Sequence, residues 1–326
     1  MTAVLVVGGA GYVGSHCCQE LHASGYRPVV IDNFTTGHRD FVRWGPCEDG
    51  DVRDRDFLLD VFDRHKPAAV MHFAAKSLVG ESVDHPEIYY DNNVSGTLNL
   101  LNCMVARGVS ELVFSSTCAI YGAHGGATID EDCAKGPLSP YGFTKLVCEQ
   151  MMDDFSQAYG LRSVRLRYFN ASGADPKAEI GEHHVPETHL IPLVLDVALG
   201  LREAIRVFGS DYPTPDGSAI RDYIHVCDLA DAHVKAVDYL ARGGPTMAVN
   251  LGTGTGSSVL DVIGQTEAAL DRAIRIEAAP RRPGDATALV ANPAQAQARL
   301  GWRPTRSALP QIIADAWRWH QKRFGG

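Results

Sequence analysis

Short apolar runs alternate with helical patterns along the first half of the chain. The runs occupy residues 3–7, 28–31, 68–73, 111–115 and 163–168. Their nearly continuous apolar character is typical of strands that are buried on both faces of a parallel sheet. After the first run, Val13, Cys17 and Leu21 recur at i, i+4 and i+8, which predicts one face of a helix, and residues 91–107 predict a longer helix. This alternation predicts an α/β fold with a Rossmann-type doubly wound parallel sheet.

The pattern changes after Asn170. Residues 171–192 are rich in Gly, Pro, Glu and His and predict a loop, and a second glycine-rich stretch at 252–258 precedes a helical pattern at 259–270. We therefore expect a smaller C-terminal domain and a chain that crosses the domain boundary more than once. The expected Rossmann domain comprises residues 1–170 and roughly 222–247, and the second domain comprises residues 171–221 and 248–326.

Composition narrows the class of function. Lys and Arg total 30 and Asp and Glu total 39, so the formal charge of −9 argues against a nucleic-acid-binding protein, which needs a basic face. No apolar run approaches the roughly 18–20 residues of a membrane span. Glycines interrupt the apolar N-terminus, which also lacks the basic start of a signal peptide. The 8 cysteines form no C-x-x-C pair, so we expect reduced thiols in a cytoplasmic protein.

A glycine-rich loop joins the first predicted strand to the first predicted helix. Gly8, Gly11 and Gly14 allow a tight turn, close approach of the backbone to a pyrophosphate, and phosphates against the helix N-terminus. Asp32 ends the second strand, 18 residues beyond Gly14. Its carboxylate can accept hydrogen bonds from both ribose hydroxyls of an adenosine and would repel a 2′-phosphate. The sequence therefore predicts a dinucleotide site, for NAD rather than NADP.

A Tyr–Lys pair begins a later helix. Ser139 can cap this helix and Pro140 suits its first position, which puts Tyr141 and Lys145 on one face at i and i+4. A neighbouring ammonium lowers the pKa of a tyrosine, which is otherwise near 10 and too high for a base. The spacing alone is typical of an ordinary helix start, but behind a dinucleotide fold it predicts a catalytic base. Thr117 ends another predicted strand, where this fold binds its ligands.

These motifs together resemble the extended short-chain dehydrogenase/reductase superfamily and, more closely, the family of UDP-glucose (UDP-galactose) 4-epimerases. The resemblance covers essentially the whole chain. Its most specific motifs are Asp-Tyr-Pro-Thr at 211–214 and Arg-Asp-Tyr-Ile-His-Val at 221–226. It implies reversible epimerisation at C4 of UDP-glucose and UDP-galactose through a 4-keto intermediate and transient NADH. UDP-N-acetylhexosamines are further candidate substrates.

The resemblance also implies a role for individual residues. Tyr141 would take the proton of the 4-OH group, Lys145 would hold the nicotinamide ribose and lower the pKa of Tyr141, and Thr117 would bond the 4-oxygen. The NAD site would be lined by Gly8, Gly11, Tyr12, Val13, Gly14, Asp32, Asn33, Asp51, Val52, Phe73, Ala74, Ala75, Asn92, Tyr141, Lys145 and Tyr168. The UDP-sugar, bound by the C-terminal domain, would contact Thr117, Tyr141, Asn170, His189, Leu190, Phe208, Arg221, Arg282, Asp285 and Leu289.

Two positions depart from the family pattern, and a third bears on the choice of substrate. Ser77 stands where many members have a lysine, and Lys76 lies one place early, which leaves its contact open. His189 stands where many members have an asparagine, and it remains a candidate uridine contact. Leu289 is smaller than the Tyr of enzymes restricted to glucose and galactose, which leaves room for an acetamido group, but it is bulkier than the Cys, Ser or Gly of the most permissive enzymes. We therefore expect UDP-N-acetylglucosamine to be turned over more slowly than UDP-glucose and UDP-galactose.

We expect no metal site, and we expect the protein to be a homodimer. His183, His184 and His189 could suggest a metal site, but the sequence reading finds no matching third-ligand pattern and no acidic partner, and favours a solvated loop. The resemblance implies a homodimer whose interface is formed by helices near 91–107 and 140–159.

Several alternatives bear on the reaction. Sugar-nucleotide 4,6-dehydratases carry Asp-Glu directly after the active-site Thr, and uronate decarboxylases keep the Glu, whereas Cys118 and Ala119 follow Thr117 here. A non-catalytic NAD-sensing regulator would typically lack the Tyr–Lys pair. A UDP-pentose 4-epimerase, or another NAD-dependent enzyme that modifies sugar nucleotides, stays open as an alternative.

Overall fold

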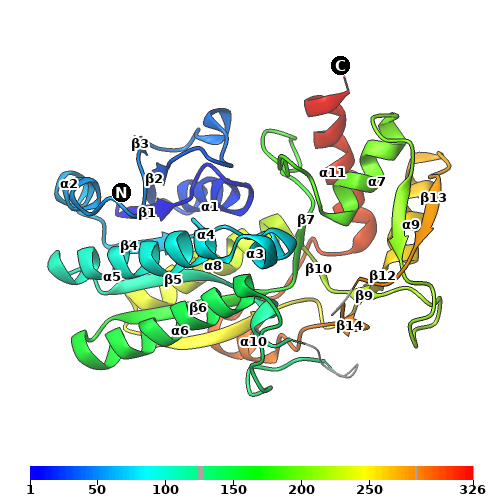
Figure 1. The fold of residues 1–326 in the computed structure, drawn as a ribbon. Helices are drawn as coiled ribbons and strands as arrows, with labels where there is room; N and C mark the ends of the chain where they lie inside the picture. Colours follow the sequence, from blue (N-terminus) through cyan, green and yellow to red (C-terminus); the bar gives the residue numbers. More distant parts are fainter. Residues whose placement is uncertain (123–127, 283–284, 326) are drawn as a thin grey trace.

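A seven-stranded parallel sheet forms the centre of the molecule. The computed structural model describes residues 1–122, 128–282 and 285–325. The strand order of the sheet is β11-β6-β5-β4-β1-β2-β3 (Figure 1). Its strands are β1 (Ala3–Val7), β2 (Arg27–Asp32), β3 (Cys47–Asp49), β4 (Ala69–His72), β5 (Glu111–Thr117), β6 (Arg162–Tyr168) and β11 (Met247–Leu251). The first six strands have the 3-2-1-4-5-6 order of a Rossmann fold, which confirms the predicted fold class.

Helices cover both faces of this sheet, and the strand sequences reflect it. In β1, Val4 and Val6 pack on one side with residues of α1 (Tyr12–Ala23) and α8 (Val226–Ala241). Leu5 and Val7 pack on the other side with residues of α2 (Arg55–His65), α5 (Gly96–Ala106) and α6 (Pro140–Tyr159). Because successive side chains of a strand point to opposite faces, a strand covered on both sides must be apolar throughout, as β1 is.

The C-terminal part of the chain builds a second group of elements beside the sheet. Helices α7 (Leu190–Leu199), α9 (Val259–Leu270) and α11 (Leu309–Phe324) pack around a shared apolar cluster that includes Ile191, Val262 and Ile312. Figure 1 shows them on the side of the molecule away from α2 and α5. The short strands are β7 (Asn170–Ser172) with β10 (Tyr223–His225), β8 (Ile205–Phe208) with β13 (Ile276–Ala279), and β9 (Ile220–Arg221) with β12 (Ser257–Ser258) and β14 (Ala288–Leu289). The remaining elements are η1 (Arg39–Phe41), α3 (Val79–Asp84), α4 (Pro86–Tyr89), η2 (Tyr90–Ser95), η3 (Cys118–Ile120) and α10 (Ala294–Leu300).

Local patterns predicted most elements, and the differences arise from distant pairings. All five predicted strands are present, and the predicted helix over 259–270 coincides with α9. The predicted helix over 91–107 begins as a π-helical segment, η2, and continues as α5. The stretch expected to be a loop contains part of β7, because Asn170–Ser172 pairs with the distant β10. Residues 248–251 lie in the main sheet, paired with β6, although they were assigned to the second domain; the domain division itself stays a prediction.

Two expectations from composition concern membranes and thiols. Among the described residues, no helix combines the length and apolar character needed to cross a membrane. All eight cysteines are free thiols, as predicted.

Candidate active site

Many of the predicted site residues lie at the carboxyl ends of the central strands. The glycine loop follows β1, Asp32 ends β2, Phe73 follows β4, Thr117 ends β5 and Tyr168 ends β6. Because these strands are parallel, their carboxyl ends share one edge of the sheet, where open α/β sheets bind ligands.

The glycine loop is shaped for a ligand as well as for its own packing. A Cβ at Gly8, which has φ +84°, would lie 2.5 Å from the amide nitrogen of Ala74, and one at Gly14 would lie 2.2 Å from the carbonyl oxygen of Gly8. At Gly11 the nearest described atom would be 3.4 Å away, so the packing of the chain does not itself demand a glycine there. Gly11 is the N-cap of α1, without a side-chain cap or an acidic residue in the first turn. The loop therefore leaves backbone N–H groups and a bare backbone for an anionic ligand.

Acidic and amide side chains border this loop. Asp32 is 8% exposed; its carboxylate accepts hydrogen bonds from the backbone nitrogens of Ala10 (3.0 Å) and Phe34 (2.9 Å), and burial raises its pKa. A carboxylate offers about four acceptor sites, so capacity remains for a ribose. Asn33 donates to Asp51 at 2.9 Å, and hydrogen bonds from Arg53 hold the pKa of Asp51 below its usual range.

The other predicted NAD contacts adjoin the same edge. The backbone nitrogens of Phe73 (2.7 Å) and Ala74 (3.0 Å) donate to Val7 O, which ties the segment containing Ala75 to the end of β1. Val52 lies against Gly96, because a Cβ there would be 2.7 Å from Val52 Cγ1. Val13 packs against the core on the α1 side of the sheet, and the Tyr12 hydroxyl donates to Gly173 O at 2.6 Å.

Tyr141, at the start of α6, lies beside the Thr117 side chain at the end of β5. Ser139 caps α6 by accepting from Gly142 N at 3.2 Å, which places Tyr141 in the first turn as predicted. Burial raises the pKa of Tyr141 to about 12 against the lowering effect of its hydrogen bond with Thr117. Lys145 Nζ donates to Ser115 O at 2.9 Å, and burial lowers the pKa of Lys145 to about 8.

This arrangement differs from one expectation. The sequence predicted a lowered pKa for Tyr141, whereas the structure raises it, because burial dominates and Lys145, whose Nζ donates to Ser115 O, does not offset it. Tyr141 is therefore placed beside the Thr117 hydroxyl, but needs a further positive charge or hydrogen bond to act as a base at neutral pH.

A buried ion pair between α6 and β6 was missed by the sequence analysis. Glu149 accepts from Arg167 Nε (2.9 Å) and Nη2 (2.6 Å) and from Ser116 Oγ (2.6 Å). Arg167 also donates to the Tyr121 hydroxyl at 2.7 Å, and Glu149 and Arg167 are both 3% exposed. Glu149 continues the i, i+4 row of Tyr141 and Lys145 by one turn, and this periodicity was the signal available in the sequence.

Asn93 was also missed, although its neighbour Asn92 was predicted. Asn93 is buried, accepts from Lys76 N at 2.8 Å, and donates to Lys76 O at 3.0 Å and to Thr144 Oγ1 at 3.1 Å. Asn92 donates to the Asn93 side chain at 3.0 Å. Tyr168 shares a short hydrogen bond with Ser115.

Four of the predicted substrate residues form two side-chain pairs. The Arg221 guanidinium donates to Ala286 O at 2.9 Å and forms an ion pair with Asp285. The Arg282 guanidinium lies 3.9 Å from the ring centroid of Phe208. Pro283 and Gly284, which belong to the same motif, lie outside the described residues.

Strand β9, the middle strand of the small three-stranded sheet, connects further predicted substrate residues to Arg221. Leu289 is the register partner of Arg221 in the β14–β9 pair. Asp222 N donates to Leu289 O at 3.1 Å, and Asp222 O accepts from Asn170 N at 3.0 Å. Arg221, Leu289 and Asn170 are thus connected through one backbone segment.

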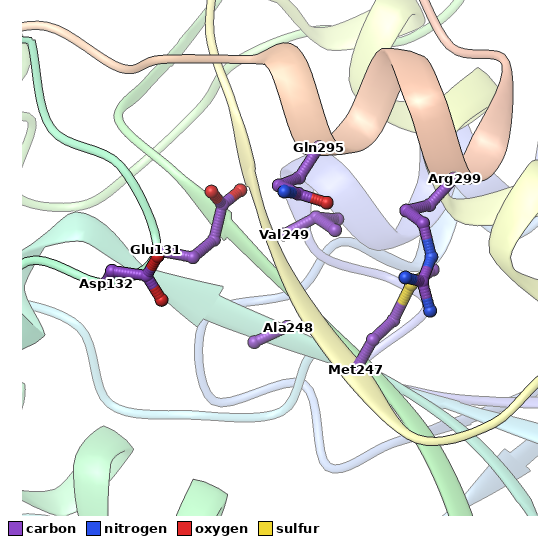
Figure 2. A pocket seen from close by; sticks show the side chains of 7 residues that line it. All are labelled: Glu131, Asp132, Met247, Ala248, Val249, Gln295 and Arg299. Carbon is purple, nitrogen blue, oxygen red and sulfur yellow. The ribbon is translucent and has the colours of Figure 1, made fainter.

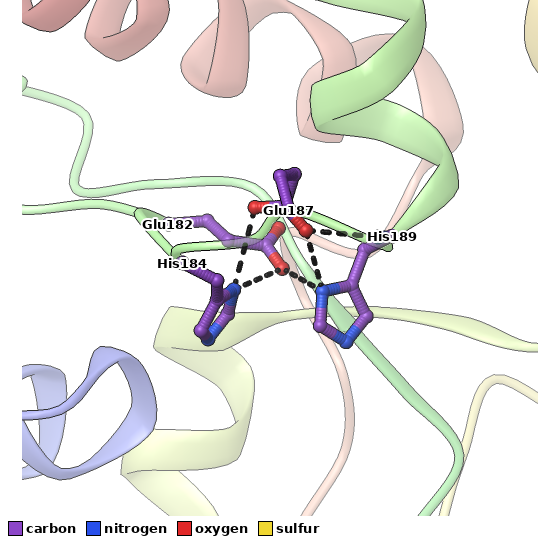
Figure 3. A group of neighbouring side chains, drawn as sticks. All are labelled: Glu182, His184, Glu187 and His189. Atoms are coloured by element: carbon purple, nitrogen blue, oxygen red, sulfur yellow. Dashed lines mark hydrogen bonds and ion pairs between the residues drawn. The ribbon is translucent and has the colours of Figure 1, made fainter. Parts of the chain in front are cut away.

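His189 and Leu190 lie at the start of α7 in different surroundings. Leu190 packs among the apolar residues shared by α7, α9 and α11. His189 forms ion pairs with Glu182 and Glu187, and His184 lies beside them (Figure 3). The sequence reading found no acidic partner for these histidines, and the structure supplies two.

One surface pocket lies elsewhere. Its lining residues come from β11, from α10 and from the distant residues 131–132. They are Glu131, Asp132, Met247, Ala248, Val249, Gln295 and Arg299 (Figure 2). None of these is a predicted site residue, so we assign the pocket no role in the reaction.

Comparison with known proteins agrees with this geometry. Residues 4–252 match the NAD dependent epimerase/dehydratase family. The chain is 55% identical over 323 residues to the UDP-glucose 4-epimerase of Rhizobium meliloti, covering 99% of this chain and 98% of that protein. It is 56% identical to the UDP-glucose 4-epimerase of Rhizobium leguminosarum bv. trifolii, covering 98% of this chain and 97% of that protein.

Solved structures resemble it equally over their whole length. The UDP-glucose 4-epimerase from Brucella ovis in complex with NAD has a TM-score of 0.96 and 48% identity, covering 98% of this chain and 99% of that one. The UDP-glucose 4-epimerase from Bifidobacterium longum in complex with NAD+ and UDP has a TM-score of 0.93 and 38% identity, covering 100% of both chains. Together with the glycine loop and the Tyr–Thr pair at one sheet edge, these likenesses show that the chain belongs to the NAD dependent epimerase/dehydratase family and, within it, to the UDP-glucose 4-epimerases.

Proposed function

We propose that this protein is an NAD-dependent enzyme that interconverts UDP-glucose and UDP-galactose by reversible oxidation at C4. The observation that carries the proposal is the placement of Tyr141 beside Thr117, at the same sheet edge as the glycine loop. Alcohol oxidation at a dinucleotide needs a proton acceptor and a hydroxyl partner beside the cofactor, and this pair supplies both.

The residues around the glycine loop fit NAD. The unshielded Gly11 and the N-terminus of α1 suit the pyrophosphate, and Asp32 has acceptor capacity left for a ribose. When bound, NAD accepts a hydride from C4 of the sugar and later returns it, which is the chemistry that it supplies. Lys145, buried beneath Tyr141, would hold the nicotinamide ribose and bring a positive charge toward the phenol.

Proton movement falls to Tyr141. In the oxidation step its phenolate takes the proton of the 4-OH group, and in the reduction step the phenol returns it to the 4-oxygen, so no proton is gained or lost in a cycle. Thr117 would hydrogen-bond the same oxygen in both directions. Because the hydride returns to the opposite face, the 4-keto sugar must turn over while the nucleotide stays bound.

The positions of Arg221 and Arg282 support tight binding of a diphosphate. The chain carries a formal charge of −9, so an anionic substrate needs a local positive site. Arg221 pairs with Asp285 and Arg282 lies over the Phe208 ring, and a guanidinium can present two parallel N–H groups to a phosphate. We propose that Arg221, Arg282, Phe208 and Asn170 hold the UDP, with Asp285 orienting Arg221 and Leu289 lining the sugar pocket.

Elimination and decarboxylation are less well supported. A dehydratase needs an acid and a base after the active-site Thr, and Cys118 occupies the first of these positions. Burial raises the pKa of the Cys118 thiol to about 12, so it would not serve as a base at neutral pH. This observation favours epimerisation.

We also propose a homodimer and a cytoplasmic location. Leu98 on α5 and Phe143 and Tyr159 on α6 are large apolar side chains that are 41%, 46% and 62% exposed, and they lie on the two helices that the sequence assigned to the interface. The eight free thiols support a reducing compartment.

One experiment tests the activity directly. Purified protein is incubated with UDP-galactose without added cofactor, and the sugar nucleotides are separated by ion-exchange chromatography. We expect UDP-glucose at an equilibrium ratio, and release of NAD when the protein is denatured. Accumulation of a 4-keto-6-deoxy sugar nucleotide would instead show that the protein is a dehydratase and would contradict the proposal.

A further inference from the structure

Four side chains in the loop before α7 converge on one point. Glu182, His184, Glu187 and His189 each direct one ligand atom inward, and these four atoms all lie within 4.8 Å of one another (Figure 3). His189 Nδ1 lies 2.8 Å from a Glu187 oxygen and 3.0 Å from a Glu182 oxygen. His184 Nδ1 lies 3.3 Å and 3.4 Å from oxygens of the same two carboxylates.

These spacings are close to those between ligand atoms around one small metal ion. Zinc binds histidine nitrogen and carboxylate oxygen at about 2.0–2.2 Å, so the ligand atoms of a tetrahedral zinc site lie about 3.4 Å apart. The two nitrogen–oxygen distances at His184 (3.4 and 3.3 Å) have about this value, and the two at His189 (3.0 and 2.8 Å) are shorter. His184 faces Oε2 of Glu187 and His189 faces Oε1, so one of these oxygens would bind the ion. A small outward shift of the His189 ring would therefore complete the arrangement.

The donor set selects the kind of ion. Two imidazole nitrogens and two carboxylate oxygens suit zinc and other late divalent transition metals, whereas calcium and magnesium prefer oxygen ligands only. The two carboxylates carry two negative charges, which one divalent cation would balance. Without an ion, the two histidines pair directly with the two glutamates.

The ligands are held in place by a second layer of contacts. Glu182 is 6% exposed, and its carbonyl oxygen accepts from Trp319 Nε1 of α11 at 2.9 Å. Glu187 accepts from His189 N at 2.8 Å, and the His184 ring stands edge-on to Tyr12 of α1, with 6.1 Å between ring centroids. Contacts of this kind orient metal ligands before the ion arrives and raise its affinity.

We propose that Glu182, His184, Glu187 and His189 bind one zinc ion, which fastens the loop before α7 to α1 and α11. All four ligands come from the protein, so the site is structural. The ion would lie outside the Tyr141–Thr117 pair and would take no part in the reaction. His189 would then act as a zinc ligand and not as a uridine contact.

Metal content of the full chain tests the proposal. Protein produced without a histidine tag and purified without chelator should carry about one zinc per chain by inductively coupled plasma mass spectrometry. After removal of the metal, zinc at about 100 times its Kd should raise Tm by about 4 °C, and magnesium at the same concentration should not.

Variants assign the site. His184→Gln should weaken zinc binding at least about 100-fold. His85→Gln is the matched control, because His85 also faces a glutamate, Glu87 at 3.7 Å, but on the surface, and it should bind zinc like the wild type. Equal zinc affinity in His184→Gln and wild type would overturn the assignment.

A measurement on the wild-type protein tests the proposal even if the His184→Gln variant fails to fold. Cobalt added to the metal-free wild type should give the intense visible absorption of a tetrahedral ion, and zinc should bleach it. Wild-type protein that shows no such spectrum, takes up no stoichiometric zinc and keeps its Tm would show that the loop binds no metal and would overturn the proposal.

Discussion

At the scale of single residues, burial and hydrogen bonding set the chemistry of Tyr141. The phenol is buried, and with a pKa of about 12 it stays protonated at neutral pH, so it cannot accept a proton until the charge of Lys145 or a bound ligand lowers that value. Lys145 itself has a pKa of about 8, because burial disfavours its charged form. The Tyr–Lys pair is thus two groups with opposite shifts, and each becomes charged more easily when the other is charged.

Removing the phenolic oxygen should remove the base. Tyr141→Phe should reduce kcat with UDP-galactose at least about 10²-fold, because proton transfer by a placed side chain contributes about 10² to 10⁴ in rate. Tyr159→Phe, an exposed tyrosine on the same helix, is the control and should keep wild-type activity. Retention of more than a third of the turnover by Tyr141→Phe would contradict the assignment, provided that its NAD content is normal.

Asp32 should govern retention of the cofactor. Because NAD is regenerated in each cycle, we expect the protein to be purified with NAD already bound. Asp32→Ala should weaken NAD binding at least about tenfold, since hydrogen bonds to a charged acceptor contribute about 1.5–3 kcal/mol each. Isothermal titration of NAD-free protein measures the affinity. Asp60→Ala, which removes a carboxylate from an exposed ion pair with Arg64, should have no effect, and an equal loss in both variants would refute the role of Asp32.

Leu289 should limit the size of the sugar. It packs partly buried beside Phe169 and Ile120, next to Arg221 in the β14–β9 pair. We expect UDP-N-acetylglucosamine to be a slower substrate, and Leu289→Tyr to suppress its turnover about ten- to hundredfold while UDP-galactose is little affected. Leu289→Met keeps the volume and serves as the control. No wild-type turnover of the N-acetyl substrate, or equal slowing of both substrates by Leu289→Tyr, would exclude Leu289 as the gate.

At the scale of elements, the Glu149–Arg167 pair joins α6 to β6. Burial would raise the pKa of Glu149, but the hydrogen bonds and charge of Arg167 outweigh it and lower the pKa. A lowered folded-state pKa means that the stabilisation is present above the ordinary Glu pKa of about 4.3 and is lost as the pH falls through the folded-state value. The pair also supports Ser116, next to Thr117, from beneath.

Breaking this pair should destabilise the whole fold. Glu149→Gln should lower the free energy of unfolding at pH 7 by about 3–5 kcal/mol, because it leaves Arg167 buried without its counter-charge. Urea denaturation followed by circular dichroism measures the change. Asp63→Asn breaks the more exposed ion pair with Arg107 and should cost at most about 1 kcal/mol. Similar losses in the two variants would mean that burial of the Glu149 pair carries no extra weight.

At the scale of the whole molecule, apolar side chains remain on the face formed by α5 and α6. Exposed apolar patches of this kind mark interfaces. We expect analytical ultracentrifugation to find a dimer of the 35.2 kDa chain. Phe143→Lys should shift the equilibrium toward monomer, whereas Leu201→Lys, an exposed leucine at the end of α7, should not. A monomeric wild type, or a dimer that is insensitive to Phe143→Lys, would count against this interface.

The sequence by itself determined the features that depend on neighbours along the chain. Apolar runs such as residues 3–7 could be recognised as buried strands, because burial on both faces requires apolar residues at consecutive positions. The glycine loop and the Tyr141–Lys145 spacing were also readable, because a tight turn and one helical turn are local geometries. The specific roles of Arg221 and Arg282 came from family resemblance and not from spacing.

Tertiary structure decided what depends on residues distant in the sequence or on the path of a loop. Arg167 meets Glu149, and Arg282 meets Phe208, only because the strands and helices between them pack in one way. The raised pKa of Tyr141 follows from burial, which no local pattern reports. Glu182, His184, Glu187 and His189 are close in sequence, but an irregular loop has no fixed period. Their convergence on one point therefore became visible only when the fold fixed the backbone around them.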